Sequence, residues 1–295
     1  MEKILIIGCG EVGLRAARLA REKGVEVAVL VRSEERRRQL GEGGFAALAG
    51  DLDTPASLPG LPTRGAVVLY FVPPPEGGDG DPRMNAFCAS IAPGEEPEKI
   101  VYISTSGVYG DCGGARITEE APVNPRTDRA RRRLAAENHL REWGARRGVA
   151  IVVLRVSGIY GPGRLPLERI RTGQPVLAEA EAPWTNRIHV DDLARVCIAA
   201  GEKGETGDIF NVSDGRPGTM TEYFNAVADA CGLPRPPQVS LAEARRVMTP
   251  LMLSYLGESR RMDNTRMVEK LGFELLYPDL ESGIRASLEE SRKPD

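Results

Sequence analysis

The sequence is poor in the residues that build metal centres and covalent cross-links. Its 295 residues include only two histidines and five cysteines, and no two cysteines form a Cys-x-x-Cys pair. An odd number of scattered cysteines argues against a disulfide framework, and the shortage of both residue types argues against a structural zinc site. The cysteines are Cys9, Cys88, Cys112, Cys197 and Cys231. We therefore predict no metal site and a cytoplasmic, reducing location.

Long apolar runs and an excess of positive charge are also missing. No apolar stretch approaches the roughly 18 residues of a membrane span, and the opening run Ile4–Ile7 is too short for a signal peptide. Lysine and arginine together number 39 against 42 acidic residues, a formal net charge of −3. Nucleic-acid binders usually carry a basic stripe. We expect neither a membrane nor a nucleic acid as a partner, and a small-molecule substrate instead.

Hydrophobic residues, 41% of the chain, occur in short runs separated by amphipathic stretches. Continuous apolar runs of this length are typical of parallel strands covered on both faces. The amphipathic stretch Glu11–Lys23 lies between two of them, and Gly24 follows as a helix stop. The alternation predicts an α/β fold with a doubly wound parallel sheet. The expected strands are Ile4–Ile7, Val25–Val31, Ala66–Val72, Ile100–Ser104 and Val149–Leu154.

The last third of the chain has a more helical pattern than the rest. Thr219-x-x-Glu222 and Ser240-x-x-Glu243 have the spacing of capping boxes. We predict a dinucleotide-binding Rossmann-type domain in residues 1–156 with 188–212. A smaller helix-rich substrate-binding lobe is expected in residues 157–187 with 213–295.

Residues 8–13 read Gly-Cys-Gly-Glu-Val-Gly, a G-x-G-x-x-G motif between an expected strand and an expected helix. Gly8 permits the tight turn, Gly10 lets backbone amides approach a pyrophosphate, and Gly13 lets the helix pack close to the strand. The strand–turn–helix context supports dinucleotide binding, whereas the alternative is a tight turn without a ligand. The residues assigned to the cofactor here are Gly8, Gly10, Glu11, Val12 and Gly13.

The end of the second expected strand bears on which dinucleotide binds. An acidic residue there usually accepts hydrogen bonds from the adenosine ribose, but this chain has Arg32 and Ser33. A guanidinium and a hydroxyl suit a 2′-phosphate, so we predict NADP(H), with NAD less expected. The alternative is that Arg32 binds no phosphate and is simply a solvated residue at the start of a helix. Asp51 and Leu52 follow the expected strand Phe45–Ala49 and are assigned to the adenine end, although a loop aspartate is also commonly solvated.

Several further motifs follow the glycine fingerprint in a fixed order. Together they resemble the extended short-chain dehydrogenase/reductases, the superfamily of nucleotide-sugar epimerases and dehydratases, over nearly the whole chain. The motifs are STSGVYGD at 104–111, PVNP at 122–125, LRVSGIYGPGR at 154–164, RIHVDDL at 187–193 and FNVSDG at 210–215. We also assign to the cofactor site Val72, Pro73, Ser104 and Ser157.

The resemblance implies a catalytic tyrosine, a lysine four residues later, and a serine or threonine. In that family the three exchange a proton with a substrate hydroxyl while a hydride moves to or from the nicotinamide. The resemblance places the hydroxyl role at Thr105, with Ser106 as its neighbour, and leaves Tyr109 as a candidate proton donor. Tyr160 is a second candidate proton donor, and a structural role is the favoured alternative for both tyrosines. Asp191 is expected to cap a helix, beside a structural His189.

The sequence departs from the family where the tyrosine and lysine should stand. Alignment on Glu137 places Arg129 at the tyrosine position and Arg133 at the lysine position. A guanidinium stays protonated near neutral pH, so neither side chain can exchange a proton there. These arginines are either a solvated helix face or a site for an anionic group. The residues assigned to the substrate are Arg129, Arg133, Tyr160, Arg164 and Arg187.

Two functions remain open from the sequence. The first is an NADP(H)-binding, epimerase/dehydratase-like oxidoreductase with unusual acid/base residues and a small polar or nucleotide-linked substrate. The second is a non-catalytic NADP(H)-binding sensor or scaffold. Relatives often pair through two helices, so a homodimer is also open.

Overall fold

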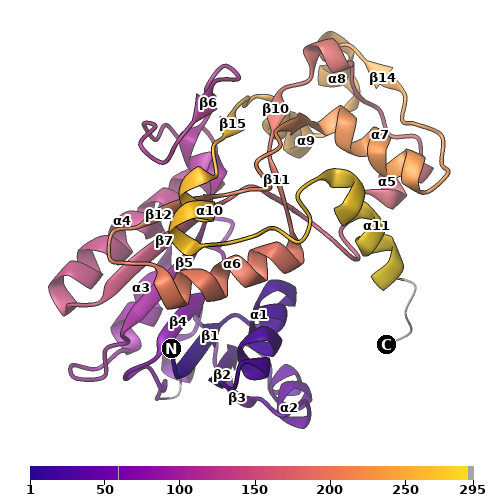
Figure 1. The fold of residues 1–295 in the computed structure, drawn as a ribbon. Coiled ribbons are helices and arrows are strands. Elements are labelled where there is room, and N and C mark those ends of the chain that lie inside the picture. Colours follow the sequence, from indigo (N-terminus) through magenta and orange to yellow (C-terminus); the bar gives the residue numbers. More distant parts are fainter. Residues whose placement is uncertain (59, 292–295) are drawn as a thin grey trace.

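The centre of the molecule is a seven-stranded, wholly parallel β-sheet (Figure 1). The computed structural model describes residues 1–58 and 60–291. Across the sheet, the strand order is β12 (Ile209–Val212), β7 (Ala150–Val156), β5 (Lys99–Thr105), β4 (Val67–Tyr70), β1 (Lys3–Ile7), β2 (Glu26–Val31) and β3 (Ala46–Ala49). The predicted α/β, doubly wound architecture is confirmed.

Helices cover both faces of the sheet because its strands are apolar on both sides. Alternate residues of β1 point to opposite faces, with Ile4 and Ile6 in one core and Leu5 and Ile7 in the other. The first core is covered by α1 (Glu11–Glu22), α2 (Glu34–Glu42), α6 (Val190–Lys203) and α10 (Thr265–Leu271). The second is covered by α3 (Pro82–Ser90) and α4 (Asp128–Arg147).

The C-terminal part forms a smaller lobe with a core of its own, which lies at the upper right of Figure 1. Its helices are α5 (Leu167–Arg171), α7 (Met220–Ala230), α8 (Leu241–Val247), α9 (Pro250–Leu256) and α11 (Leu280–Glu290). Short strand pairs lie in and beside this lobe: β8 (Gly158–Tyr160) with β11 (Arg187–His189), β9 (Val176–Leu177) with β14 (Gln238–Val239), and β10 (Trp184–Thr185) with β13 (Gly218–Thr219). A further pair, β6 (Arg116–Ile117) with β15 (Arg261–Met262), connects residues 116–117 of the sheet domain to the C-terminal part. The exact division of the chain stays a prediction.

Side-chain caps fix where several helices begin. Thr219 and Glu222 form the predicted capping box at the start of α7. Ser240 accepts a hydrogen bond from the Glu243 amide at the start of α8. Short 3-10 turns span Pro55–Ser57, Ser106–Tyr109 and Glu179–Glu181.

All seven strands point the same way, so their carboxyl ends meet at one edge of the sheet. The loops that follow β1, β2, β4, β5 and β7 therefore gather there, and this edge carries the cavities described below. Among the described residues, no helix is long and apolar enough to span a bilayer.

Candidate functional site

The fingerprint loop between β1 and α1 lines a groove of about 770 Å³, which we call the glycine groove. Gly8 has a φ of +88°, and a Cβ there would lie 2.6 Å from Cγ2 of Val72. A Cβ on Gly13 would lie 2.8 Å from the Gly8 carbonyl oxygen. Gly10, by contrast, faces open space, with nothing within 4 Å of an added Cβ. The cradle therefore has room for a pyrophosphate at the backbone of Gly10, as a dinucleotide requires.

The far end of the glycine groove carries the residues that follow β2 and β3. Arg32, Ser33, Asp51 and Leu52 all line it, as do the fingerprint residues, Val72 and Pro73. Ser33 caps α2 by accepting a hydrogen bond from the Arg36 amide at 3.2 Å. Arg36 also lines the groove, so two guanidinium groups lie at its adenosine end. Sequence reasoning missed Arg36, although its place three residues after the helix cap was a usable signal.

An ion pair connects two of the segments that line the groove at this end. Arg83, at the start of α3, donates to both carboxylate oxygens of Asp53, at 2.7 and 2.6 Å. It also donates to the Pro73 carbonyl at 3.0 Å. The hydrogen bond from Arg83 holds the pKa of Asp53 below its usual value. Arg83 thus fixes the proline-rich segment after β4 against the groove.

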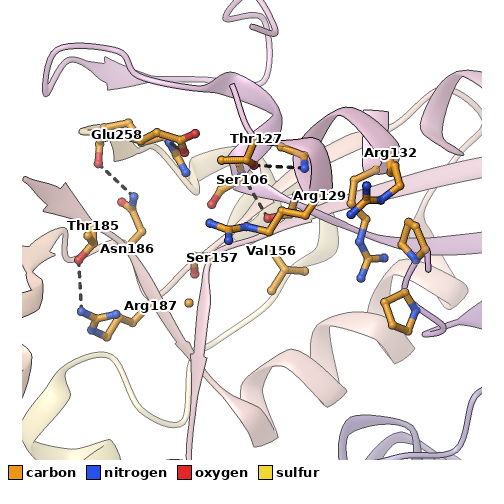
Figure 2. A pocket seen from close by; sticks show the side chains of 18 of the residues that line it. Ser106, Thr127, Arg129, Arg132, Val156, Ser157, Thr185, Asn186, Arg187 and Glu258 are labelled. Atoms are coloured by element: carbon orange, nitrogen blue, oxygen red, sulfur yellow. Dashed lines mark hydrogen bonds and ion pairs between the residues drawn. The ribbon is translucent and has the colours of Figure 1, made fainter. Parts of the chain in front are cut away.

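A second cavity, of about 480 Å³, lies where the sheet edge meets the smaller lobe (Figure 2). Pro73 and Arg133 line both cavities, so the two meet at these residues. The charged residues that line the second cavity are Arg129, Arg132, Arg133, Arg187, Arg260, Glu76 and Glu258. Because arginines outnumber carboxylates there, we call it the arginine cavity.

The two arginines at the family's tyrosine and lysine positions both reach this cavity from α4. Arg133 donates to the Ile103 carbonyl at 2.5 Å and to the Tyr102 hydroxyl at 3.4 Å. Arg129 donates to the Ser254 hydroxyl at 3.3 Å, and Figure 2 shows its side chain extending across the middle of the cavity. The solvated-face interpretation of these two arginines is therefore not what the geometry shows.

Hydroxyl groups lie on the sheet side of the arginine cavity. Thr105 and Ser106 line it, and Thr105 accepts a hydrogen bond from the Gly107 amide at 3.2 Å. Ser157 lines the same cavity rather than the glycine groove to which it was assigned. Its hydroxyl oxygen is buried and has no partner among the described residues. Ser157 therefore contributes to the lining of the arginine cavity, with its hydroxyl oxygen turned away from open space.

The opposite wall holds the buried Arg187. The Arg187 guanidinium stacks 4.1 Å from the Tyr223 ring centroid. It also donates to the Thr185 hydroxyl at 3.2 Å (Figure 2). Burial lowers the pKa of Arg187 and raises that of nearby Asp214 to about 7. Arg187 has no carboxylate within salt-bridge distance among the described residues. A buried cation of this kind favours an anionic ligand.

Glu258 and Arg260 form an ion pair on the same wall, at 2.8 Å. Arg260 also donates to the Gly110 carbonyl at 2.6 Å, which holds the pair in place. The second carboxylate oxygen of Glu258 is buried without a partner among the described residues. The wall therefore combines charges of both signs beside the cavity.

Three assigned residues lie outside both cavities. Tyr109 is 1% exposed, and its hydroxyl donates to Asn211 Oδ1 at 2.7 Å. Burial also raises the pKa of Tyr109, so the structure does not support it as a proton donor in either cavity. Ser104 is buried, and its hydroxyl donates to the Glu137 carboxylate rather than facing a cofactor. Tyr160 lies in the core of the smaller lobe, where burial raises its pKa well above the usual value.

Arg164 was assigned to the substrate, but it lines the glycine groove and not the arginine cavity. Its side chain pairs with Glu11, the first residue of α1. The loop after β8 turns back toward the sheet domain, which explains the difference.

The functional residues that sequence reasoning missed come from segments far apart in the chain. No local motif marks their contribution, because folding alone brings the segments together. They include Glu76, Thr127, Asn186, Glu258 and Arg260, whereas Trp184, which also lines the cavity, was expected from the sequence to suit substrate recognition. In the described part of the chain, no group of three or more His, Cys, Asp or Glu side chains is placed to hold a metal ion.

Comparison with protein families gives two matches. Residues 86–213 match the NAD dependent epimerase/dehydratase family, and residues 4–107 match the TrkA-N domain. The two matches together cover the sheet and the residues on the sheet side of both cavities. The family binds a nicotinamide dinucleotide, which agrees with the geometry of the glycine groove.

Curated relatives share about a quarter of their residues with this chain. Protein YeeZ of Escherichia coli (strain K12) is 28% identical over 181 residues, and the match spans 61% of this chain and 59% of that protein's length. A 3-diazoavenalumate denitrifying reductase from Streptomyces sp. is 26% identical over 304 residues, covering 96% of this chain and 99% of that protein.

Solved structures share the fold over the whole length. A functionally unknown conserved protein from Silicibacter pomeroyi DSS has a TM-score of 0.83 at 28% identity, covering 99% of this chain and 100% of that one. UDP-N-acetylglucosamine 4-epimerase from Bacillus cereus has a TM-score of 0.75 at 18% identity, covering 100% and 98%. Residues 86–213 therefore match the NAD dependent epimerase/dehydratase family, and the chain as a whole has the fold of solved structures that include a UDP-N-acetylglucosamine 4-epimerase.

Proposed function

We propose that the protein is an NADP(H)-dependent oxidoreductase of the epimerase/dehydratase type, acting on a small polar or nucleotide-linked substrate that carries negative charge. One observation carries this proposal: the glycine groove and the arginine cavity meet at Pro73 and Arg133. A nicotinamide cofactor supplies or accepts a hydride when bound. A ligand in the arginine cavity would lie next to the nicotinamide end of the groove.

The preference for NADP(H) rests on the charges at the adenosine end. Arg32 and Arg36 both line the groove, and Ser33 lies between them. Two guanidinium groups suit a phosphate because they donate paired hydrogen bonds to its oxygens. We propose that they hold the 2′-phosphate, which NAD lacks.

The charge of the arginine cavity supports an anionic substrate. Arg132 and Arg187 are both about nine-tenths buried, and the Nε of Arg132 has no partner among the described residues. Burying a cation without an anion is costly, and a phosphate or carboxylate in the cavity would offset that cost.

The arginines at the tyrosine and lysine positions would act by position and charge. Arg129 would orient the substrate and stabilise negative charge on the reacting oxygen, since it cannot release a proton near neutral pH. Thr105 and Ser106 would donate hydrogen bonds to the same oxygen. The Streptomyces relative that aligns over nearly the whole chain is named a reductase, which fits this type of chemistry.

One observation favours a second function, a non-catalytic NADP(H) sensor or scaffold. No tyrosine, histidine, lysine or cysteine is among the described residues that line the arginine cavity. Among the described residues that line the cavity, only Glu76 and Glu258 belong to the side-chain types that commonly act as general acids or bases.

The first experiment is a titration of the protein with NADPH and with NADH, followed by nicotinamide fluorescence. We expect NADPH to bind more tightly, and Arg32→Gln to remove that preference while leaving NADH affinity unchanged. Equal affinities for the two dinucleotides in the wild type would contradict the NADP(H) assignment.

A second experiment tests the arginine cavity. Phosphate, citrate and UDP-glucose are compared with neutral glucose by thermal shift, in the wild type and in Arg129→Gln/Arg133→Gln. We expect the anions alone to stabilise the wild type, and the double variant to lose that effect. Arg131→Gln is the matched control, because Arg131 lies on the same helix but is half exposed and paired with Asp128. NADPH consumption with a reducible anion would then separate the enzyme from the sensor.

A further inference from the structure

We propose that Arg164 binds the pyrophosphate of the dinucleotide by exchanging its present partner, Glu11, for the ligand. Glu11 then acts as a built-in competitor that lowers the affinity of the glycine groove for its cofactor. The proposal rests on the proposed function, since it requires that the groove take NADP(H).

The pair spans the groove from two separate parts of the fold. Glu11 is the first residue of α1 in the sheet domain, and Arg164 follows β8 in the loop that leads into the smaller lobe. Arg164 Nε lies 2.5 Å from Glu11 Oε2, and both residues line the groove. The side chains therefore meet above the fingerprint loop, although 153 positions separate them in sequence.

Glu11 lies beside the place where a ligand's negative charge is expected. The open space in front of Gly10, its neighbour in sequence, is where the backbone can approach a pyrophosphate. The positive end of α1 and the Arg164 guanidinium both favour an anion at this point, and the Glu11 carboxylate now supplies it. A bound pyrophosphate would bring a second anion to the same cations, so the two would compete for Arg164.

After the exchange, both Arg164 and Glu11 would still have a group of opposite charge nearby. The side chains of Arg164 and Glu11 are 38% and 33% exposed, and exposed ion pairs contribute little to stability. Glu11 also has a second cation, Arg15, at 3.8 Å, which would still face it after Arg164 moves. The backbone of Arg164 is held by a hydrogen bond from its amide to the Gly161 carbonyl, so only the flexible side chain must move.

The test compares three ligands by isothermal titration calorimetry. NADPH and ADP-ribose contain a pyrophosphate, whereas 2′,5′-ADP occupies the adenosine end without one. The proteins are the wild type, Arg164→Gln, Glu11→Gln and the double variant. Arg171→Gln and Glu22→Gln are matched controls, because both residues are exposed, the first in the smaller lobe and the second at the far end of α1.

We expect Arg164→Gln to lower the affinity for NADPH and for ADP-ribose by about tenfold, as for the loss of one charge-assisted contact. The affinity for 2′,5′-ADP should not change. Glu11→Gln should tighten NADPH by about two- to fivefold, as expected for removing an anion beside the ligand. This gain should shrink in the Arg164→Gln background, because part of it comes from freeing Arg164. The controls should bind all three ligands as the wild type does.

Two results would overturn the assignment while the proposed function stands. One is unchanged NADPH affinity in Arg164→Gln, and the other is an equal loss for all three ligands, which would point to a general disturbance of the groove. Failure of the wild type to bind any of the three ligands would instead overturn the proposed function, and this assignment with it.

Discussion

Glu137 lies inside α4 with no exposed surface, and several side chains share its carboxylate. Arg155 and Arg141 each donate to Oε2 at 2.9 Å, and the Ser104 hydroxyl donates to Oε1. Arg155 is also buried, so the pair connects α4 to β7 in a region that excludes water. A buried charge that loses its partner is far more costly than an exposed one.

We expect Glu137→Gln to lower the free energy of unfolding by about 3–5 kcal/mol, because Arg155 would keep its charge without a buried partner. Urea denaturation measures this change. Glu281→Gln is the control, because it breaks an exposed pair with Arg285 on α11 and should leave stability nearly unchanged. Equal effects of the two substitutions would show that burial of Glu137 does not matter.

The fingerprint glycines separate a folding role from a binding role. Gly8→Ala should destabilise the protein by about 1–2 kcal/mol or more, because its positive φ is strained for alanine and the new Cβ meets Val72. Gly10→Ala should fold normally, since its φ is −77° and its surroundings are open. It should nevertheless lower the affinity for NADPH by about tenfold or more, or about 1.4 kcal/mol, because the added methyl group fills space that the ligand needs. Thermal unfolding and NADPH titration of both variants would show whether the two roles separate.

For single residues, the sequence predicted which residue types form the site better than it predicted where their side chains point. Arg129 and Arg133 were placed by their spacing from Glu137 on one helix, and both reach a cavity. Ser104 and Tyr109 lie at the end of β5 and in the turn that follows it, but their hydroxyls donate to Glu137 and Asn211 instead of facing a cavity. The direction of a side chain depends on partners from distant segments, which no local pattern contains.

His189 begins helix α6 by an unusual contact. Its Nδ1 accepts a hydrogen bond from the Asp191 amide at 3.2 Å, so the histidine and not Asp191 is the cap, and the sequence-based expectation was wrong. Its Nε2 lies 3.2 Å from the Ser287 hydroxyl, which itself donates to the Gly283 carbonyl. The neutral ring with its proton on Nε2 satisfies both contacts and joins α6 to α11.

Protonation of His189 should loosen this junction. Burial lowers the pKa of His189, although the carboxylates of Asp191 and Asp192 oppose the shift. The unfolded chain therefore takes up a proton first, at about pH 6.5. The contribution of His189 to stability is complete above that pH and is lost as the pH falls toward its lower value in the folded protein. Arg15 and Glu290 also face the ring.

The measurement is the free energy of unfolding between about pH 7.5 and about pH 5.5, in the wild type and in His189→Asn. Asparagine retains a capping oxygen but does not titrate. We expect the wild type to lose more stability on acidification than the variant. Asp214, whose raised pKa of about 7 gives the opposite slope, is present in both proteins and cancels in the difference. Parallel curves would show that His189 does not titrate in this range.

The elements themselves were largely predictable from local pattern. The expected strand Ile100–Ser104 is Lys99–Thr105 in the structure, and the expected helix Glu11–Lys23 is Glu11–Glu22. Apolar runs and a terminal glycine were sufficient for this, because the elements are buried by their own hydrophobic residues. The two-residue strands of the smaller lobe had no such signal, since they form only where distant segments pair.

Over the whole molecule, the parallel sheet places its binding loops at one edge. The sequence therefore allowed us to predict residues on the sheet side of both cavities. It did not allow us to predict the opposite wall of the arginine cavity. That wall is assembled from residues such as Arg187 and Glu258, which belong to different segments of the smaller lobe. The proline-rich loop after β4 forms part of the same cavity, and Arg132 holds it through the Gly78 carbonyl at 3.2 Å.

Insertions at the two edges of the sheet should therefore differ in effect. A flexible insertion of about four residues after Gly94, an exposed turn between α3 and β5, should leave NADPH and anion binding unchanged, since long surface loops cost little. The same insertion after Gly78 should weaken anion binding, because it would release Arg132. Titration of both proteins with NADPH and phosphate checks this, and equal behaviour would contradict the edge argument.

The order of the strands also has a consequence for synthesis on the ribosome. β1 is made first and lies inside the sheet, β2 and β3 extend it on one side, and β4, β5, β7 and β12 extend it on the other. Each new strand therefore joins an existing edge, and none has to be inserted between two strands already paired. The sheet can grow outward in the order in which the chain emerges, without reopening what has already formed.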